Sequence, residues 1–426
     1  MCAMNRLART ALLGILAVLV TVPALAQGLY YKEILKDGRY YVFNNARNAE
    51  LFETGGEMGV AITLPGAGPD GATVIGDSER ALQLFFFKHG IAYAVPDPPP
   101  PPPPAGPFRL TGLVFGDYYG FASNHLPAFE DQHGLWLRRG YFTFDYTHNP
   151  RVSSRLRFEM NSNGKLAGGA LTPYVKDAYV RWNFHGRQNL MLGIQPSLTF
   201  EFVESIWGLR HIEKTPLDLY RVDSSRDTGV TLFGPLNETQ TMRYAVQFGN
   251  ESGNNAEADK FKGYRAVVRH ETNPGFSVEG MFGHFNRSGD ADRTTGQVFL
   301  GYRQPNARFG VQYSYQKRQA PSGSPASDVE LKVASAFVVA EVKPQKVWAF
   351  LRADRVASPC SDCTGIDYLP IASGTPFTFV LAGIEYYLLP NVRFSPNIEF
   401  VSYSTPASGQ KPKNDAVARL TFYWAW

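Results

Sequence analysis

From residue 107 to the C-terminus, about sixteen strand-length segments are joined by connections that are short and long in turn. The short connections include HNPRV, HGRQ, TNPG, QPNA, KPQK and LPNV, and long polar ones such as NHLPAFEDQHG, NESGNNAEADK and NRSGDADRTT fall between them. Outer-membrane barrels have short periplasmic turns and longer external loops. The pattern therefore predicts an all-β fold over residues 107–426, a transmembrane antiparallel β-barrel of about sixteen strands with both ends on the periplasmic side.

Within these segments, apolar side chains alternate with polar ones, so each strand would have two different faces. The C-terminal ARLTFYWAW places Leu420, Phe422, Trp424 and Trp426 on one face and Arg419, Thr421 and Tyr423 on the other. A soluble β-sandwich is the alternative. Its edge strands would need helices or loops to cover them, and the polar faces of its strands would not carry so many arginines. A closed barrel satisfies every backbone group in lipid. We therefore expect outer-membrane lipid to contact the apolar face.

The N-terminus has the features of a secretory signal peptide. Arg6 and Arg9 precede the apolar run ALLGILAVLVTV, and Ala24-Leu25-Ala26 is typical of a cleavage site before Gln27. An N-terminal membrane anchor is the alternative, but the run is short for a membrane helix of roughly 20 residues. Residues 1–26 are therefore predicted to be removed on export, which leaves the periplasm, the outside of the cell or the bacterial outer membrane as the destination. The predicted barrel favours the bacterial outer membrane.

A proline run divides the exported chain. Asp97 is followed by prolines 98–104, which favour an extended polyproline II spacer, so residues 96–106 are predicted to be a linker. Before it, DGRYYVFNNARNAELFETGG and DGATVIGDSERALQLFFFKHG each follow an apolar strand. Because Asp-Gly is a hairpin signal, residues 27–95 are predicted to be a small α+β module made of a repeated ββα unit. Asp77 or Ser78 would cap its second helix.

This module lies in the periplasm if both ends of the barrel do. It contains no recognisable catalytic set, so we expect a binding or assembly role with peptidoglycan or a periplasmic protein as the partner. A structural tether to the envelope is accordingly one alternative function of the whole chain.

Sixteen strands would enclose an aqueous lumen. Its wall is predicted to include the arginines at inward positions, which are Arg139, Arg155, Arg157, Arg181, Arg243, Arg265, Arg303, Arg308, Arg393 and Arg419. Fewer acids share this face: Asp145, Glu159, Asp177 and Glu399. Arginines in a confined lumen attract anions. The alternative is that they pair with the inward acids and brace the wall, and both roles can coexist.

The longest connection, residues 201–226, reads EFVESIWGLRHIEKTPLDLYRVDSSR. Long loops are usually functional, and this one is predicted to fold inward and constrict the channel. Its apolar residues Phe202, Ile206, Trp207 and Leu209 would contact the barrel wall. Its charged residues would face the channel, namely Glu204, Arg210, His211, Lys214, Arg221 and Arg226. An external loop packed on its neighbours is the alternative.

Two cysteines remain after export, Cys360 and Cys363 in SPCSDCTG. A metal half-site or a redox pair is conceivable, but no second cysteine pair or flanking histidine completes a metal site. The surrounding Pro, Ser and Gly indicate a loop, so a structural disulfide at a loop tip is predicted. We expect no metal and no cofactor.

Several segments resemble the phosphate-selective porin O and P family. They are LRRGYFTFDYT followed by RLRFEMNS, then YVKDAYVRWNF with LGIQPSLTFE, and SRDTGVTLFG after the long loop. The resemblance implies a sixteen-stranded trimeric channel with an inward third loop. Phosphate-selective members of the family use an arginine ladder and loop lysines, whereas the long loop here has one lysine, Lys214. The N-terminal module and the proline run are not part of the family pattern.

The sequence therefore predicts an outer-membrane porin for passive diffusion of small hydrophilic solutes, with a weak preference for anions and phosphate as one candidate. We expect a homotrimer and no nucleic-acid partner. An enzyme is not expected, because the histidines are scattered and form no triad motif. A barrel-based hydrolase is kept as the least favoured alternative.

Overall fold

The structure is a computed structural model that describes residues 30–56, 58–59, 61–91, 106–161, 170–272, 275–358, 369–372, 374–406 and 409–426. Its contacts divide the chain into two compact units, Met1–Pro103 and Pro104–Trp426. The predicted signal peptide (1–26), most of the predicted linker and the cysteine pair Cys360 and Cys363 lie outside the described residues.

The first unit is a four-stranded sheet with two helices. Its elements are β1 (Lys32–Lys36), β2 (Arg39–Phe43), α2 (Ala46–Gly55), β3 (Ile62–Leu64), η1 (Pro69–Gly71), β4 (Thr73–Gly76) and α3 (Glu79–His89). The strand order is β1-β2-β4-β3, in which β2 and β4 are parallel and the outer pairs are antiparallel. Two ββα units therefore meet at their second strands, and the predicted repeat is confirmed.

Local sequence explains the first hairpin of this unit and its helix packing. Asp37 and Gly38 both have positive φ, 50° and 69°, as a tight hairpin between right-twisted strands requires. Helix α3 packs on one face of the sheet around Val42, and α2 packs on the other face around Phe43. Because successive strand residues point to opposite faces, one strand supplies both small cores.

The two cap candidates have different roles. Ser78 caps α3 by accepting a hydrogen bond from the Ala81 N–H at 3.1 Å. Asp77 instead accepts from the N–H groups of Asn44 and Asn45, at 2.9 and 3.1 Å, at the start of α2. Its carboxylate thus connects the two repeats.

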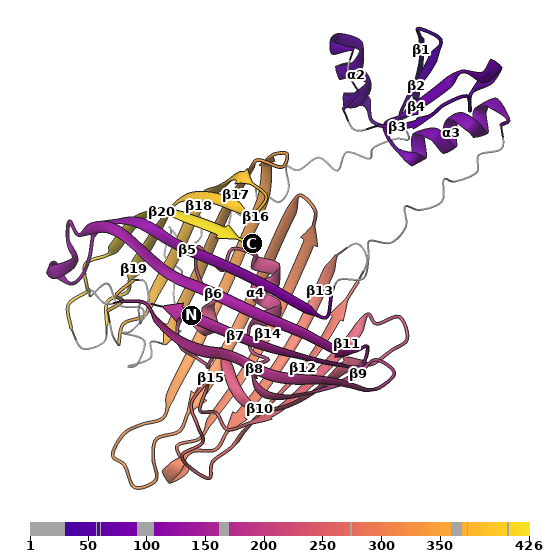
Figure 1. The fold of residues 1–426 in the computed structure, drawn as a ribbon. Helices are drawn as coiled ribbons and strands as arrows, with labels where there is room; N and C mark the ends of the chain where they lie inside the picture. The colour runs from indigo at the N-terminus through magenta and orange to yellow at the C-terminus, as the bar shows by residue number, and fades with distance from the viewer. Residues whose placement is uncertain are drawn as a thin grey trace, which may run out of the picture. The chain divides into compact units, whose positions relative to one another are not determined.

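The second unit is a closed barrel in which each strand pairs antiparallel with the next and β20 pairs with β5 (Figure 1). Its strands are β5 (Phe108–Ser123), β6 (His133–Asn149), β7 (Val152–Asn161), β8 (Thr172–His185), β9 (Gln188–Pro196), β10 (Arg226–Pro235), β11 (Met242–Gly249), β12 (Gly263–Glu271), β13 (Phe276–Phe285), β14 (Arg293–Gln304), β15 (Ala307–Arg318), β16 (Val329–Lys343), β17 (Val347–Ser358), β18 (Phe377–Leu389), β19 (Val392–Tyr403) and β20 (Asp415–Ala425). Its short helices are η2 (Pro127–Phe129), α4 (Glu201–Trp207), α5 (Pro216–Leu219) and η3 (Ser288–Asp290). Each predicted strand segment corresponds to one of these strands, so the predicted antiparallel barrel is confirmed.

The C-terminal strand closes the ring at the end of the barrel where the short turns lie, which we call the short-turn end. Trp426 and Gly112 exchange two backbone hydrogen bonds, of 2.9 and 3.1 Å. The Trp426 ring lies directly over Gly112, where an added Cβ would lie 2.2 Å from the ring. A glycine is needed there because of this close approach. Both ends of the barrel therefore emerge beside the short turns, as predicted.

The outer face of the barrel is apolar and exposed. Large side chains on it include Leu156, Trp182, Val298, Ile398 and Trp424, which are 38 to 54 % exposed. A continuous apolar surface of this kind is far larger than soluble proteins leave in water, whereas a barrel in lipid requires it. The fold is accordingly a transmembrane β-barrel. No helix in the described ranges is long and apolar enough to cross a membrane.

Candidate functional site in the barrel lumen

The segment between β9 and β10, residues 197–225, lies inside the barrel, where Figure 1 shows α4 within the ring of strands. We call this segment the inward loop. Its four apolar residues proposed as wall contacts, Phe202, Ile206, Trp207 and Leu209, are all buried in one cluster with the inner faces of the strands. The indole of Trp207 packs edge-on against Phe337 and Phe350, with ring centroids 5.1 and 6.2 Å away. Burial of these aromatic side chains fixes the loop against one side of the lumen.

Polar contacts fix the same loop along its length. The Arg265 guanidinium of β12 binds the Asp223 carboxylate, with Nη2–Oδ1 2.7 Å. The Tyr220 hydroxyl donates to Asp354 of β17 at 2.7 Å. Arg138 of β6 donates to the Ile212 carbonyl at 3.0 Å from the opposite side. Since buried hydrogen bonds are costly to leave unmade, these contacts hold the loop in one position.

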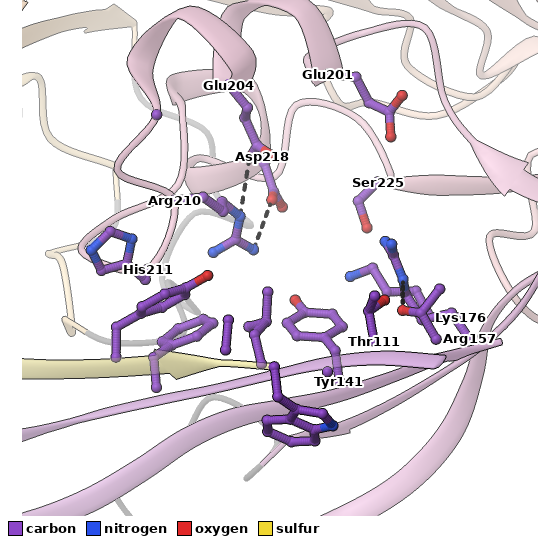
Figure 2. A pocket seen from close by; sticks show the side chains of 18 of the residues that line it. Thr111, Tyr141, Arg157, Lys176, Glu201, Glu204, Arg210, His211, Asp218 and Ser225 are labelled. Atoms are coloured by element: carbon purple, nitrogen blue, oxygen red, sulfur yellow. Dashed lines mark hydrogen bonds and ion pairs between the residues drawn. The ribbon is translucent and has the colours of Figure 1, made fainter. Parts of the chain in front are cut away.

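A cavity of about 640 Å³ remains between the inward loop and the wall formed by β5 to β8, β19 and β20. Its cationic lining residues are Arg109, Arg157, Lys176, Arg210, Arg226 and Arg393, and its acidic ones are Glu201, Glu204 and Asp218. Figure 2 shows Glu204, Arg210 and Asp218 of the loop facing Tyr141 and Arg157 of the wall across this space. The cavity lining is therefore charged, with more cationic than acidic side chains, although Asp177, Glu159 and Glu385 behind it pair with four of the cations.

Within the loop, Arg210 lies between its two acidic neighbours. Its Nε is 3.1 Å from Glu204 and its Nη2 is 3.4 Å from Asp218. The side chain of Glu201 has neither a hydrogen bond nor an ion pair within the described residues, and it is exposed to the cavity. The loop thus offers the cavity one carboxylate without an ion-pair partner in the described residues, although Arg226 and Arg157 are close enough to act on its charge.

The ten arginines of the predicted lining all lie on the inner face, because they alternate along each strand with side chains of the outer face, except for Arg139, which follows the bulge at Arg138. Six of them form ion pairs. The pairs are Arg139–Glu159 (2.6 Å), Arg155–Asp145 (2.7 Å), Arg157–Asp177 (3.2 Å), Arg265–Asp223 (2.7 Å), Arg393–Glu385 (3.6 Å) and Arg419–Glu399 (3.2 Å). All four predicted inward acids are among the partners.

The other four, Arg181, Arg243, Arg303 and Arg308, have no carboxylate within ion-pair distance in the described part of the chain. Each lies near the short-turn end of its strand. The predicted dual role is therefore divided among the arginines: six of the ten form ion pairs with acids, and the four without one all lie near the short turns, where Arg155 and Arg393 are paired.

Of the predicted loop residues, Glu204, Arg210, His211 and Arg226 line the cavity, whereas Lys214 and Arg221 do not. Lys214 is buried and lies 3.6 Å from Asp218, four residues further on. The backbone of Arg221 has a φ of 52°, and its carbonyl accepts from Arg318 at 3.1 Å. The turn after α5 therefore directs this part of the loop to the wall.

Sequence alternation missed two buried cations. The β5–β6 register shifts at Arg138, between the pairs Phe115–Arg139 and Gly116–Leu137. The β7–β8 register shifts in the same way at Lys176. A β-bulge places two successive residues on one face, so Arg138 and Lys176 join the inner face. The signal in the sequence is the doublets Arg138-Arg139 and Lys176-Asp177, in which charged residues are adjacent.

No group of three or more His, Cys, Asp or Glu side chains within the described ranges is placed to hold a metal ion. No protein-family model and no curated protein sequence matches the chain. The resemblance to the phosphate-selective porin O and P family therefore stays a prediction.

Solved structures with the same fold are outer-membrane barrels. One is the anion-selective porin from Comamonas acidovorans, 12 % identical with a TM-score of 0.53, over 75 % of this chain and 99 % of that one. Another is the outer membrane channel DcaP of Acinetobacter baumannii, 14 % identical with a TM-score of 0.52, over 75 % and 97 %. A third is the trimer form of the outer membrane protein OmpT of Vibrio cholerae, 14 % identical with a TM-score of 0.51, over 76 % and 100 %. At these identities the similarity establishes the fold.

Proposed function

We propose that residues 107–426 form an outer-membrane porin for passive diffusion of small hydrophilic solutes. The observation that carries this proposal is the polar cavity of about 640 Å³ beside the inward loop. An interior filled with side chains would have no such space, whereas large barrels with a loop folded into the lumen leave a narrowed aqueous path. Porins and channels among the proteins of the same fold support this choice.

The charge of the lumen favours anions weakly. Six cationic and three acidic side chains line the cavity, and acids behind the lining pair with four of these cations. The excess of positive charge therefore comes mainly from four more arginines of the wall that have no acidic partner in the described residues. In a confined space such an excess raises the local anion concentration. Guanidinium groups also match the geometry of carboxylates and phosphates, so both classes belong in the test panel.

Planar-bilayer recordings in a KCl gradient test both parts of this proposal. We expect discrete open-channel currents and a reversal potential displaced toward the chloride equilibrium potential. Clear potassium preference would reject the anion preference alone. Proteoliposomes that neither conduct nor swell in small sugars would reject the channel. Hydrolysis of peptide or lipid substrates by the same preparation would favour the barrel-based hydrolase instead.

The N-terminal module is proposed to lie in the periplasm and to bind peptidoglycan or a periplasmic protein. This rests on its own sheet and cores, which make it a separate folded unit, and on the short-turn position of both barrel ends. The barrel is proposed to be a homotrimer, as the trimer form of one protein of the same fold suggests. Deletion of residues 27–106 should leave conductance unchanged and reduce cell-wall pull-down. A smaller oligomer after deletion would assign the module to assembly instead.

A further inference from the structure

Two arginines lie side by side at the short-turn end of the lumen. Arg303 of β14 and Arg308 of β15 are direct cross-strand partners, joined by the turn at residues 305–306. Like charges at directly opposite positions destabilise an antiparallel pair. Neither guanidinium has a carboxylate within ion-pair distance in the described residues. Something other than an acid of the wall must offset their repulsion.

The inward loop orients both side chains. Arg303 Nη2 donates to the Ser205 carbonyl and lies 3.2 Å from its hydroxyl. The Arg308 guanidinium contacts Gly208, the residue that ends α4 in a left-handed conformation. The carbonyl end of a helix favours cations, so the end of α4 offsets part of the repulsion. The two guanidinium groups are thereby held in place before any solute arrives.

Aromatic rings hold the other faces of this cluster. Arg308 lies over the Trp348 ring at 5.3 Å. Arg393 of β19 lies between Tyr387 and Tyr423, with its guanidinium carbon 4.5 and 5.0 Å from the ring centroids. Stacking occupies the flat face of a guanidinium and leaves its in-plane N–H groups for other acceptors.

The charges of Arg303 and Arg393 both act on Arg308. Glu385 is the carboxylate whose charge also reaches Arg308, but it accepts a hydrogen bond from His211 at 2.7 Å and lies 3.6 Å from Arg393. The buried Nε of Arg308 has no hydrogen-bond acceptor. A cluster of three cations thus retains an unused donor and an excess of positive charge.

We propose that Arg303, Arg308 and Arg393 bind the oxyanion group of a small solute, a carboxylate or a phosphate, at the short-turn end of the lumen. Charge-assisted hydrogen bonds from two or three guanidinium groups suit planar or tetrahedral oxyanions and not the spherical chloride ion. Because Arg393 also lines the cavity, the site adjoins it and extends anion binding toward the short turns. This inference rests on the channel function proposed above.

The test uses single-channel recordings of the whole chain in KCl with inorganic phosphate or acetate added to one compartment. We expect each anion to reduce the chloride current. The half-blocking concentration should depend on which of the two compartments receives the anion, because the site lies nearer one end of the pore. In the double variant Arg303→Gln/Arg308→Gln the half-blocking concentration should rise at least fivefold. Block by phosphate alone would narrow the ligand to phosphate and would still support the site.

A matched control removes two charges from the same end of the barrel. Arg151→Gln/Arg187→Gln changes two exposed arginines of the short turns and should shift the half-blocking concentration less than twofold. An equal shift in both double variants, or no block of the wild-type channel, would overturn the binding site while the channel function stands. Wild-type membranes without any open-channel current would overturn the proposed function itself.

Discussion

Arg265 of β12 binds Asp223 of the inward loop in a bidentate pair, with Nη2–Oδ1 2.7 Å and Nε–Oδ2 2.8 Å, and both side chains are buried. Its third nitrogen, Nη1, lies 3.0 Å from Asp227 at the start of β10. One guanidinium therefore fixes the base of the loop to two strands of the wall. Inward arginines of this kind are structural, in contrast to the unpaired arginines near the short turns.

Replacement of Arg265 by Gln should release the base of the loop. Two buried carboxylates would lose their counter-charge, which typically costs about 3–5 kcal/mol of unfolding free energy. We expect the barrel in detergent to unfold at a lower concentration of guanidinium chloride. We also expect noisier open-channel currents. Arg155→Gln is the control, because its pair with Asp145 is about 30 % exposed and should contribute less than about 1 kcal/mol. Equal losses in the two variants would contradict the structural role of Arg265.

Replacement of Gly208 by alanine should destabilise the barrel and displace Arg308. Its φ is 69°, and an added Cβ would lie 1.9 Å from Nη1 of Arg308. The left-handed backbone alone costs a non-glycine residue about 1–2 kcal/mol. We expect Gly208→Ala to lose more than this in unfolding free energy and to weaken anion block, because Arg308 must move.

Gly323→Ala separates the cost of the left-handed backbone from the clash with Arg308. Gly323 has a φ of 77°, but no atom lies within 4 Å of the position of its Cβ. It should show the backbone cost alone, with block by phosphate unchanged. Identical behaviour of the two alanine variants would show that Arg308 is not displaced.

The barrel could be predicted because its signal is repeated in every strand. In each strand, apolar residues such as Leu156 or Trp182 recur at every second position, and the connections alternate in length. Both patterns indicate the same barrel topology in each of the sixteen strands. The pairing of inward charges could not be predicted in this way. Which acid meets Arg265 or Arg139 depends on strand stagger and on the path of the inward loop, and neither is encoded by a local period.

Bulges account for the remaining differences in the site. Alternation assigns Arg138 to the outer face, whereas the register shift beside Gly116 brings it inside. Likewise, the charge of Lys214 suggested a place in the channel, but its proximity to Asp218 and its burial place it in the loop interior. Such choices follow from tertiary packing, so only the structure reveals them.

The N-terminal module should lose stability in acid through Glu33. Burial by itself would raise the pKa of Glu33, but hydrogen bonds donated by Lys88, Tyr31 and His89 outweigh it and hold the pKa below its ordinary value. A lowered folded-state pKa adds stability above the unfolded value of about 4.3, and this is lost as the pH falls through the folded value. We expect the urea midpoint of the module to fall between about pH 5 and pH 3.

The readout of this prediction can be confined to the module. Ellipticity at 222 nm includes α2 and α3, whereas tryptophan emission reports the barrel alone, because all six tryptophans lie in residues 107–426. A loss of ellipticity without a change in tryptophan emission therefore reports unfolding of the module. Glu33→Gln should lower the midpoint at neutral pH and flatten its pH dependence. Glu53→Gln, which removes a more exposed pair with Lys32, should retain most of that dependence. A wild-type profile in Glu33→Gln would exclude Glu33 as the source.

Ion selectivity should respond most strongly to Glu201, because its carboxylate faces the cavity without an ion pair in the described residues. Glu201→Gln removes the one loop carboxylate that has no described partner, so the reversal potential should move further toward that of chloride. A single charge about 4 Å from a passing ion acts with about 1 kcal/mol in water, which limits the rise of the chloride-to-potassium permeability ratio to about fivefold.

Arg157→Gln should move the potential the opposite way and by less, since Asp177 lies 3.2 Å from Arg157 and already offsets part of its charge. Glu238→Gln in an exposed short turn is the matched control and should leave the ratio nearly unchanged, because solvent and salt screen a charge at the rim. If Glu238→Gln instead equalled Glu201→Gln, selectivity would be set at the mouth of the pore and not beside the inward loop.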